Sequence, residues 1–146
     1  QELIFRLTYK TLNQLSSDTK NIKILFVFFL FHLSKQLGFM PNIDRCHSCN
    51  VLFEHDVIFS LSVQSLICEN CNIHNAFDDD FVISYDCLSQ FKLINKTHIN
   101  NIVDIQISSL HLKEIFSFLI AFMQGNINNM HKIKGIKEIT KIYHEQ

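Results

Sequence analysis

The sequence has few of the residues that interrupt regular structure: 3 glycines, 1 proline and no tryptophan among 146 residues. It contains no glycine-rich phosphate-binding loop, and no low-complexity linker or internal repeat divides the chain. Hydrophobic side chains make up 47% of the sequence, an ordinary share for a globular protein. Because a chain of this length can bury one sizeable core, residues 1–146 are predicted to form a single domain.

An excess of positive charge is also missing. The 13 basic and 14 acidic residues give a formal net charge of −1 when the 8 histidines are counted as neutral. This balance excludes nucleic-acid binding through overall charge alone, so any basic surface must be local. Residues 132–141 are the one patch suited to phosphate or an acidic peptide, although they also fit the solvated face of a C-terminal helix.

No apolar run is long enough to cross a membrane. Residues 24–31 form an apolar run of 8 residues between Lys23 and His32. A spanning helix needs roughly 20 apolar residues, so this run is predicted to be a buried core helix, with no membrane partner. Residues 1–10 mix acidic and basic side chains into the apolar ones, which does not fit a secretory signal. We therefore expect a cytoplasmic protein.

Signatures of catalysis are absent as well. The histidines are scattered, and no H-E-x-x-H motif occurs. Cys87 has no histidine and carboxylate at motif spacing, and it is predicted to be a buried, inert thiol on a helix. Asp78, Asp79 and Asp80 are predicted to form a solvated turn. We expect neither enzymatic activity nor a small-molecule substrate.

The sequence does contain several segments with apolar residues at helical spacing. They predict helices over residues 1–16, 21–37, about 84–94, 109–124 and the tail from 130 to 143. The helix over 21–37 is apolar nearly all round, which predicts a central position, and Gly38 is expected to end it. The first helix is predicted to bury one apolar stripe, formed by Leu3, Leu7, Leu12 and Leu15. The predicted fold class is therefore mainly α, a helical bundle.

The strongest signal is a pair of C-x-x-C motifs, Cys46-His47-Ser48-Cys49 and Cys68-Glu69-Asn70-Cys71, separated by 18 residues. In each motif the two sulfur atoms can reach one metal from adjacent tetrahedral corners. Residues 57–63 alternate as a strand does, and a hairpin there would return the second pair to the first. We predict one structural zinc ion bound by Cys46, Cys49, Cys68 and Cys71, in a ribbon- or knuckle-like insert over about residues 44–74.

Other uses of these cysteines are weaker. Two disulfides would need an oxidising compartment, and a thioredoxin-like redox pair uses a single C-x-x-C motif. Iron in a rubredoxin-like shell fits the spacing as well as zinc does. His47 or His74 could replace a sulfur ligand, but the complete cysteine set makes that unnecessary. Four protein ligands leave no open position for substrate, so the metal is expected to be structural.

These residues resemble a known family. The pattern Gly-x-x-Pro-x-x-x-x-Cys-x-x-Cys from Gly38 to Cys49, then Phe59-Ser60, then the run from Leu66 to Cys71, resembles the C-terminal domain of the bacterial DNA repair protein RecO. The helices over 21–37 and 109–124 fall in matching order, so the resemblance covers nearly the whole chain. The chain departs from the family at Gln64-Ser65, where the family usually has Gly-Gly before the second cysteine pair.

The resemblance implies a recombination mediator that binds single-stranded DNA, RecR and single-strand-binding protein, assists recombinase loading and anneals strands. The family's N-terminal oligonucleotide-binding barrel has no counterpart in residues 1–146, so the chain is expected to be part of a longer protein. Lys132 and Lys134 are the matching candidates for partner or DNA contacts. Phe118 and Phe122 could either receive the acidic tail of single-strand-binding protein or pack in the core. The alternative function is a zinc-stabilised protein-interaction module without a nucleic-acid role.

Overall fold

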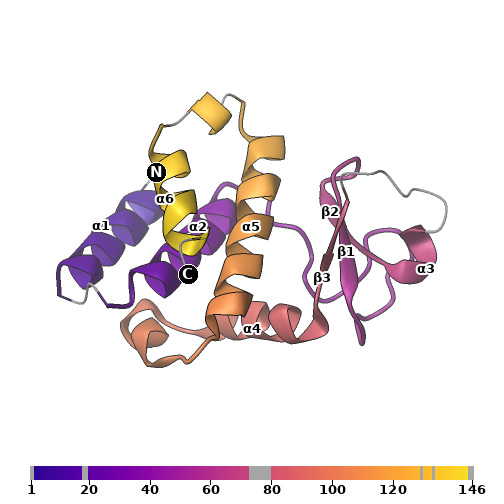
Figure 1. Cartoon of the computed structure of the whole chain (residues 1–146), viewed down its shortest axis with the longest axis horizontal. Coiled ribbons are helices and arrows are strands. Elements are labelled where there is room, and N and C mark those ends of the chain that lie inside the picture. The colour runs from indigo at the N-terminus through magenta and orange to yellow at the C-terminus, as the bar shows by residue number, and fades with distance from the viewer. Residues whose placement is uncertain (1, 18–19, 73–79, 129, 133, 145–146) are drawn as a thin grey trace.

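The computed structural model describes residues 2–17, 20–72, 80–128, 130–132 and 134–144. Five helices form a helical body: α1 (Glu2–Ser17), α2 (Ile22–Gln36), α4 (Tyr85–Lys96), α5 (Ser109–Asn126) and α6 (Lys134–His144). A small sheet and the short helix α3 (Glu69–Asn72) lie to one side of this body (Figure 1). We call residues 44–83 the cysteine module. The predicted fold class, a mainly helical bundle carrying a four-cysteine insert, is confirmed.

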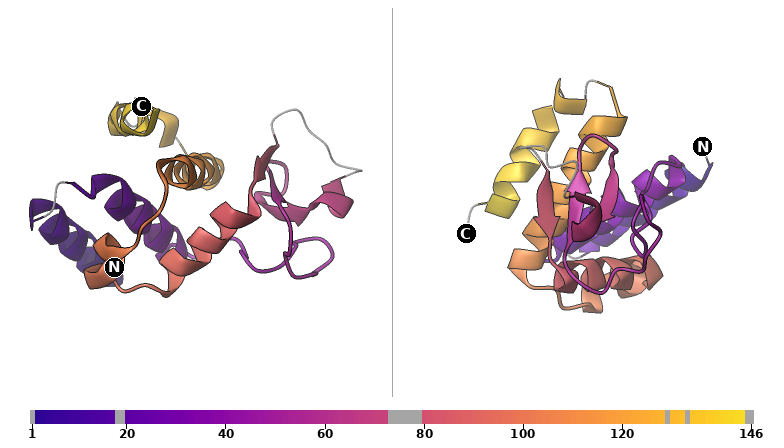
Figure 2. Two further views of the ribbon diagram at one scale, coloured as in Figure 1. Left: turned by 60° about the horizontal axis from the view of Figure 1, so that its bottom comes forward. Right: turned by 90° about the vertical axis from the view of Figure 1, so that its right-hand side faces the viewer.

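Helix α2 occupies the middle of the helical body, between α1 and α5 (Figures 1 and 2). Its apolar residues point in nearly every direction, and Leu25 and Val27 are completely buried. The helix ends as predicted, because Gly38 adopts a positive φ of 82° that glycine accepts without strain. The apolar run that is too short for a membrane is therefore the core helix. None of the helices in the described part of the chain is long and apolar enough to span a bilayer.

Helix α1 is present as predicted, but the predicted buried stripe is wrong in part. Leu7 and Leu15 pack against the core, whereas Leu3 and Leu12 are each 59% exposed. Thr11 takes an inward position instead and is buried. This is possible because its hydroxyl donates a 2.9 Å hydrogen bond to the Leu7 carbonyl of the preceding turn. The helix is therefore rotated relative to the leucine pattern.

Helices α5 and α6 close the other side of α2. Ser108 caps α5 by accepting a 3.1 Å hydrogen bond from the His111 N–H, and the helix runs through Gly125 to Asn126. The ring of Tyr143 on α6 stacks on Phe116 of α5, with 4.0 Å between ring centroids and a 4° angle between planes. The Tyr143 hydroxyl also donates to the Lys23 carbonyl at the start of α2. Tyr143 thus fastens α6 to both neighbours.

The sheet consists of β1 (Val57–Ser60), β2 (Ser65–Cys68) and β3 (Phe81–Ile83), in the order β2-β1-β3 with both pairs antiparallel. The predicted strand over 57–63 stops at Ser60, because residues 61–64 form the hairpin tip, where Gln64 has a positive φ of 50°. The sequence did not predict β3. Asp80, from the predicted acidic turn, accepts a hydrogen bond from the Leu61 N–H, whereas Asp78 and Asp79 lie outside the described residues.

The cysteine module and the helical body share one hydrophobic core. Phe59 of β1 is completely buried, and its ring lies edge-on to Phe118 of α5 at 5.0 Å between centroids. Phe118 in turn packs against Phe91 of α4 at 5.3 Å. Aromatic contacts of this kind bury much apolar area and fix the two parts together.

Candidate metal centre

The four predicted ligands meet at one point of the cysteine module. The sulfur atoms of Cys46, Cys49, Cys68 and Cys71 all lie within 4.8 Å of one another. The Cys49 and Cys68 sulfur atoms are 3.7 Å apart, far beyond a disulfide bond. A tetrahedron with Zn–S bonds of about 2.3 Å has S···S edges of about 3.8 Å. The donor set and its geometry therefore fit one four-coordinate metal ion, and the four cysteines could hold it.

The first knuckle is shaped by a narrow loop. Cys46 donates through its N–H to the Val51 carbonyl at 2.9 Å, and its own carbonyl accepts from the Asn50 N–H at 3.0 Å. Asn50 adopts a positive φ of 61°, which asparagine tolerates better than most residues. The resulting turn places the Cys46 and Cys49 sulfur atoms on the same side of the loop.

The second knuckle follows directly from β2. Cys68 is the last residue of the strand, and the single turn of α3 carries Cys71 back toward it. The His47 N–H donates to the Leu66 carbonyl at 2.9 Å, which holds the first knuckle against β2. The hairpin predicted between the two cysteine pairs therefore brings both knuckles together, as the spacing required.

The two ends of the cluster differ in acidity. Burial opposes ionisation of the Cys46 thiol, but the backbone N–H groups of Cys49, Cys68 and Ser48 outweigh it and lower its pKa to about 6. The Cys68 N–H lies 3.3 Å from the Cys46 sulfur. At Cys71, the neighbouring Cys68 and Cys49 side chains raise the pKa to about 12. A dication that binds here must therefore displace protons from the cluster, whereas Cys46 offers a ready thiolate at neutral pH.

The other residues singled out from the sequence lie apart from this centre. His47 is exposed and is not part of the cluster, and His74 lies outside the described residues. Cys87 is buried on α4, as predicted. Burial and the nearby Glu114 raise the pKa of its thiol well above the usual range. Such a thiol is protonated at neutral pH and chemically inert.

The partner residues predicted on α5 and at the C-terminal end do not come together at one site in the described part of the chain. Phe118 and Phe122 are 2% and 1% exposed, so both belong to the core and neither can receive a partner directly. Lys132 is exposed at the end of the short helix η2 (Met130–Lys132). Lys134 begins α6, but its side chain lies outside the described residues. No described contact brings Lys132 close to the cysteine cluster or to the two phenylalanines.

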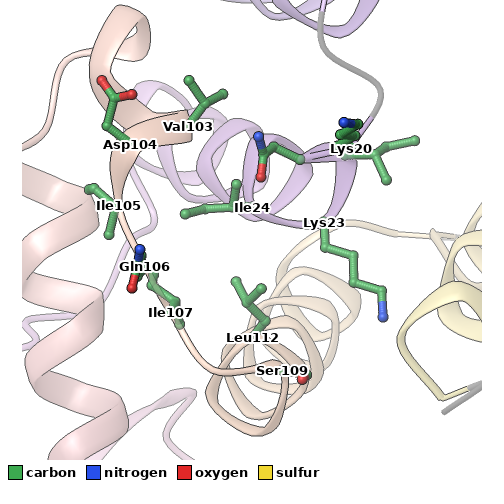
Figure 3. Close-up of a pocket in the computed structure, with 12 residues that line it drawn as sticks. Lys20, Lys23, Ile24, Val103, Asp104, Ile105, Gln106, Ile107, Ser109 and Leu112 are labelled. Carbon is green, nitrogen blue, oxygen red and sulfur yellow. The ribbon is translucent and has the colours of Figure 1, made fainter.

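The sequence did not predict two hollows of the helical body. The larger, about 660 Å³, lies between the start of α2 and the segment from η1 (Ile99–Asp104) to α5, with Lys20 and Lys23 on one side and Asp104 on the other (Figure 3). The smaller, about 250 Å³, is lined by part of the Lys23 side chain and by six mainly apolar side chains: Leu15, Ile22, Phe26, Ile139, Ile142 and Tyr143. Both depend on chain segments that meet only in the folded protein, and η1 itself had no recognisable sequence pattern.

The fold and the site together define a class: a helical domain that carries a two-knuckle, four-cysteine metal module as an insert. The family model described as "Recombination protein O C terminal" matches residues 1–134, and the chain belongs to this family. Membership supports a role in DNA repair and recombination. A search of curated proteins and a search of solved structures returned no match.

Proposed function

We propose that this chain serves as the helical, metal-stabilised part of a recombination mediator, which binds single-stranded DNA and partner proteins and thereby assists strand annealing and recombinase loading. The family match over residues 1–134 carries the proposal. The mediator works by binding, without making or breaking bonds. The reduced thiols that its metal centre needs suit the cytoplasm.

The metal in this proposal is one structural zinc ion held by Cys46, Cys49, Cys68 and Cys71. Four thiolates favour zinc or iron over harder cations, and zinc commonly occupies closed shells of this kind. The ion leaves no coordination position for substrate, so its contribution is to hold the two knuckles together. Elemental analysis of the purified chain separates zinc from iron.

DNA contact in this proposal falls to the lysines around the larger hollow and α6. Lys20 and Lys23 line the hollow, and Lys137 is exposed on α6. The Lys23 ammonium also lies 5.9 Å from the centroid of the Tyr143 ring, which keeps it near α6. Lysines on these neighbouring segments can neutralise phosphates of a single strand.

A titration of single-stranded oligonucleotide at low and moderate salt tests this assignment. Lys20→Ala, Lys23→Ala and Lys137→Ala together should weaken binding at least about tenfold and reduce the salt slope by about 2, since each phosphate contact contributes about 0.7. The matched control replaces three lysines that are exposed elsewhere on the helical body, Lys10, Lys96 and Lys113. Equal weakening by both triple variants would remove the proposed DNA surface. Salt-independent or undetectable binding would favour the protein-interaction module without a nucleic-acid role.

The smaller, apolar hollow is our proposed site for the acidic, apolar-ended tail of single-strand-binding protein, in place of the buried Phe118 and Phe122. Its lining can accept an aromatic end group, and the Lys23 ammonium, which lies near the Tyr143 ring of this lining, can pair with a carboxylate. Ile142→Ser, at an exposed position of this lining, should weaken binding of a labelled tail peptide, whereas Leu110→Ser, at an exposed position elsewhere, should not. Unchanged binding by Ile142→Ser would place the tail elsewhere.

A further inference from the structure

The charges of this chain are unevenly distributed between its two parts. The cysteine module, residues 44–83, contains one arginine and no lysine, against seven aspartate and glutamate residues. Its formal net charge is therefore −6, and since the whole chain carries −1, the remaining residues carry +5. Figure 1 shows the described residues of the module at one end of the molecule and the helical body at the other. The near-neutral total conceals an acidic end and a basic end.

The acidic end has a defined groove. A hollow of about 500 Å³ borders the cysteine cluster and is lined by Cys49, by the segment 51–56 and by residues 68–71. Val51 and Leu52 stand at this hollow and are 58% and 50% exposed. A second hollow of about 210 Å³ adjoins it and shares Asp56 and Glu69. The second hollow is also lined by Val82, whose side chain is 61% exposed.

We call these two adjoining hollows the acidic groove, whose carboxylates are Glu54, Asp56 and Glu69. Within the described part of the chain, neither Glu54 nor Glu69 has an ion-pair partner. Asp56 is oriented by the Tyr85 N–H, which donates to it at 2.8 Å. The module's own cation does not neutralise the groove, because the Arg45 guanidinium donates to the Asn50 carbonyl at 3.0 Å.

We propose that the acidic groove binds a cationic segment of a partner protein in which lysine or arginine alternates with apolar side chains. The apolar side chains would cover Val51, Leu52 and Val82, which otherwise remain in water, and the cations would pair with the three carboxylates. A nucleic-acid backbone would meet like charge in this groove. The cysteine module is therefore a protein-binding surface, although metal modules with paired cysteines often serve DNA recognition in other proteins. This inference is separate from the DNA contact proposed for the helical body.

The test uses the whole zinc-loaded chain and a panel of short fluorescent peptides in which two lysines are separated by one to four residues on a leucine-containing background. Matched peptides carry glutamate in place of lysine. The charge-removing variant is Glu54→Gln with Glu69→Gln. Its control, Glu2→Gln with Glu138→Gln, changes the net charge equally at the helical end, where both glutamates are solvent-exposed. Metal content and melting temperature are measured for every variant.

At least one lysine peptide should bind with a Kd below about 1 mM, and the groove variant should weaken it about tenfold, while the control changes it less than about twofold. Leu52→Ser should weaken it as well, and single-stranded DNA should not displace it. The inference is overturned if all lysine peptides fail to bind, if glutamate peptides bind equally, if both double variants act alike, or if DNA competes. It is also overturned if the wild-type chain self-associates through Glu54 and Glu69, because the occupant would then be a second copy.

Discussion

Among the metal-centre cysteines, Cys46 is the one that the protein encloses most completely. Its side chain is only 2% exposed, and backbone N–H groups from both knuckles point at its sulfur. Without a metal, this arrangement leaves a buried, partly ionised sulfur among three other thiols. The backbone N–H groups already stabilise the ionised form of this sulfur, and a bound cation would balance its remaining charge. The local structure around Cys46 is therefore built for the metal-bound state.

Replacing Cys46 by Ser should abolish metal binding and prevent stable folding, because metal binding and folding share their free energy in a site of this kind. Cys87→Ala is the matched control. Its thiol is equally buried but lies outside the cluster, so this variant should keep one zinc per chain and lose about 1 kcal/mol of stability. Elemental analysis and urea unfolding measure both effects. Loss of zinc from Cys87→Ala, or a folded metal-free Cys46→Ser, would show that the ligand set is wrong.

His32 on α2 is a second residue whose surroundings oppose its charged form. Its ring lies 4.2 Å from that of Phe28 and 5.2 Å from that of Phe31, measured between centroids, and its Nε2 is buried without a hydrogen-bond partner among the described residues. Burial and the nearby Lys35 lower its pKa below 6.5, although a hydrogen bond to the Ile94 backbone opposes the shift. His32 lines a hollow of about 220 Å³ together with Lys10 and His98, which add no negative charge.

The lowered pKa predicts the sign of a pH effect. The unfolded chain binds the proton more readily than the folded one, so the contribution of His32 is complete above about pH 6.5 and is lost as pH falls through the folded-state value. His32→Phe should therefore lose less stability than the wild type between about pH 7.5 and pH 5.5. Urea unfolding at both pH values, with zinc content checked, measures this difference. A His98→Phe variant is the control, and identical losses in the wild type and His32→Phe would contradict the assignment.

At the scale of elements, the tip of the β1–β2 hairpin rests on the end of α5. The Gln64 amide donates to the Leu61 carbonyl at 2.8 Å, and the Asn126 amide donates to the Gln64 side-chain oxygen at 3.4 Å. Gly125 makes room for this contact, because a Cβ at that position would clash with the Gln64 amide. Gly125, which directly follows the helix predicted over residues 109–124, is therefore a contact point between the helix and the hairpin.

Gly125→Ala should test this contact through a double-mutant cycle. Alanine favours a helix by about 1 kcal/mol over glycine, but here it must displace the Gln64 amide and break its hydrogen bonds. The variant should be destabilised by about 1 kcal/mol in the wild type and stabilised by up to about 1 kcal/mol when Gln64 is already alanine. Denaturant unfolding of the four proteins measures the coupling. A Gly125→Ala effect that is the same in both backgrounds would show that the contact carries no energy.

The sequence predicted those elements whose determinants are local. Cysteine spacing is visible in the sequence, so the meeting of the four sulfur atoms could be predicted. The mostly apolar α2 could likewise be placed in the centre. The rotation of α1 could not, because it depends on packing against the core and on the Thr11 hydroxyl, which satisfies its hydrogen bond at the Leu7 carbonyl of the same helix. The strand β3 is only three residues long and exists through its pairing with β1.

Phe118 and Phe122 show why the core was harder to predict than the helices. The helical pattern left open whether they bind a partner or pack in the core, because it considers only the neighbours within the helix. In the folded chain, Phe59 of β1 supplies a second packing surface for α5 and covers both rings. The acidic groove and the two hollows of the helical body have the same origin, since each is made by segments distant in sequence.

For the whole molecule, the shared aromatic core predicts one cooperative unfolding transition. If zinc holds the cysteine module together, its removal by a chelator should lower the melting temperature of the entire chain by at least about 10 °C. The tyrosine signal, which includes Tyr143 in the helical body, and the far-UV helical signal should then change together. Two separate transitions, with the helical signal unaffected by chelation, would mean that the module unfolds independently.

The division into an acidic and a basic end also affects how solutes sense this molecule from a distance. A folded chain of this length has a radius of gyration of about 15 Å, whereas the Debye length in physiological salt is about 8 Å. Counter-ions therefore screen the two ends from each other. A long polyanion near the helical body senses the net charge of +5 carried by the residues outside the module, and not the total charge of −1. Near such a polymer the molecule would be turned with its cysteine module outward before any contact forms. At low ionic strength the Debye length exceeds the size of the molecule, and the fields of the two ends overlap. A distant polyanion would then orient the whole molecule as a single electric dipole.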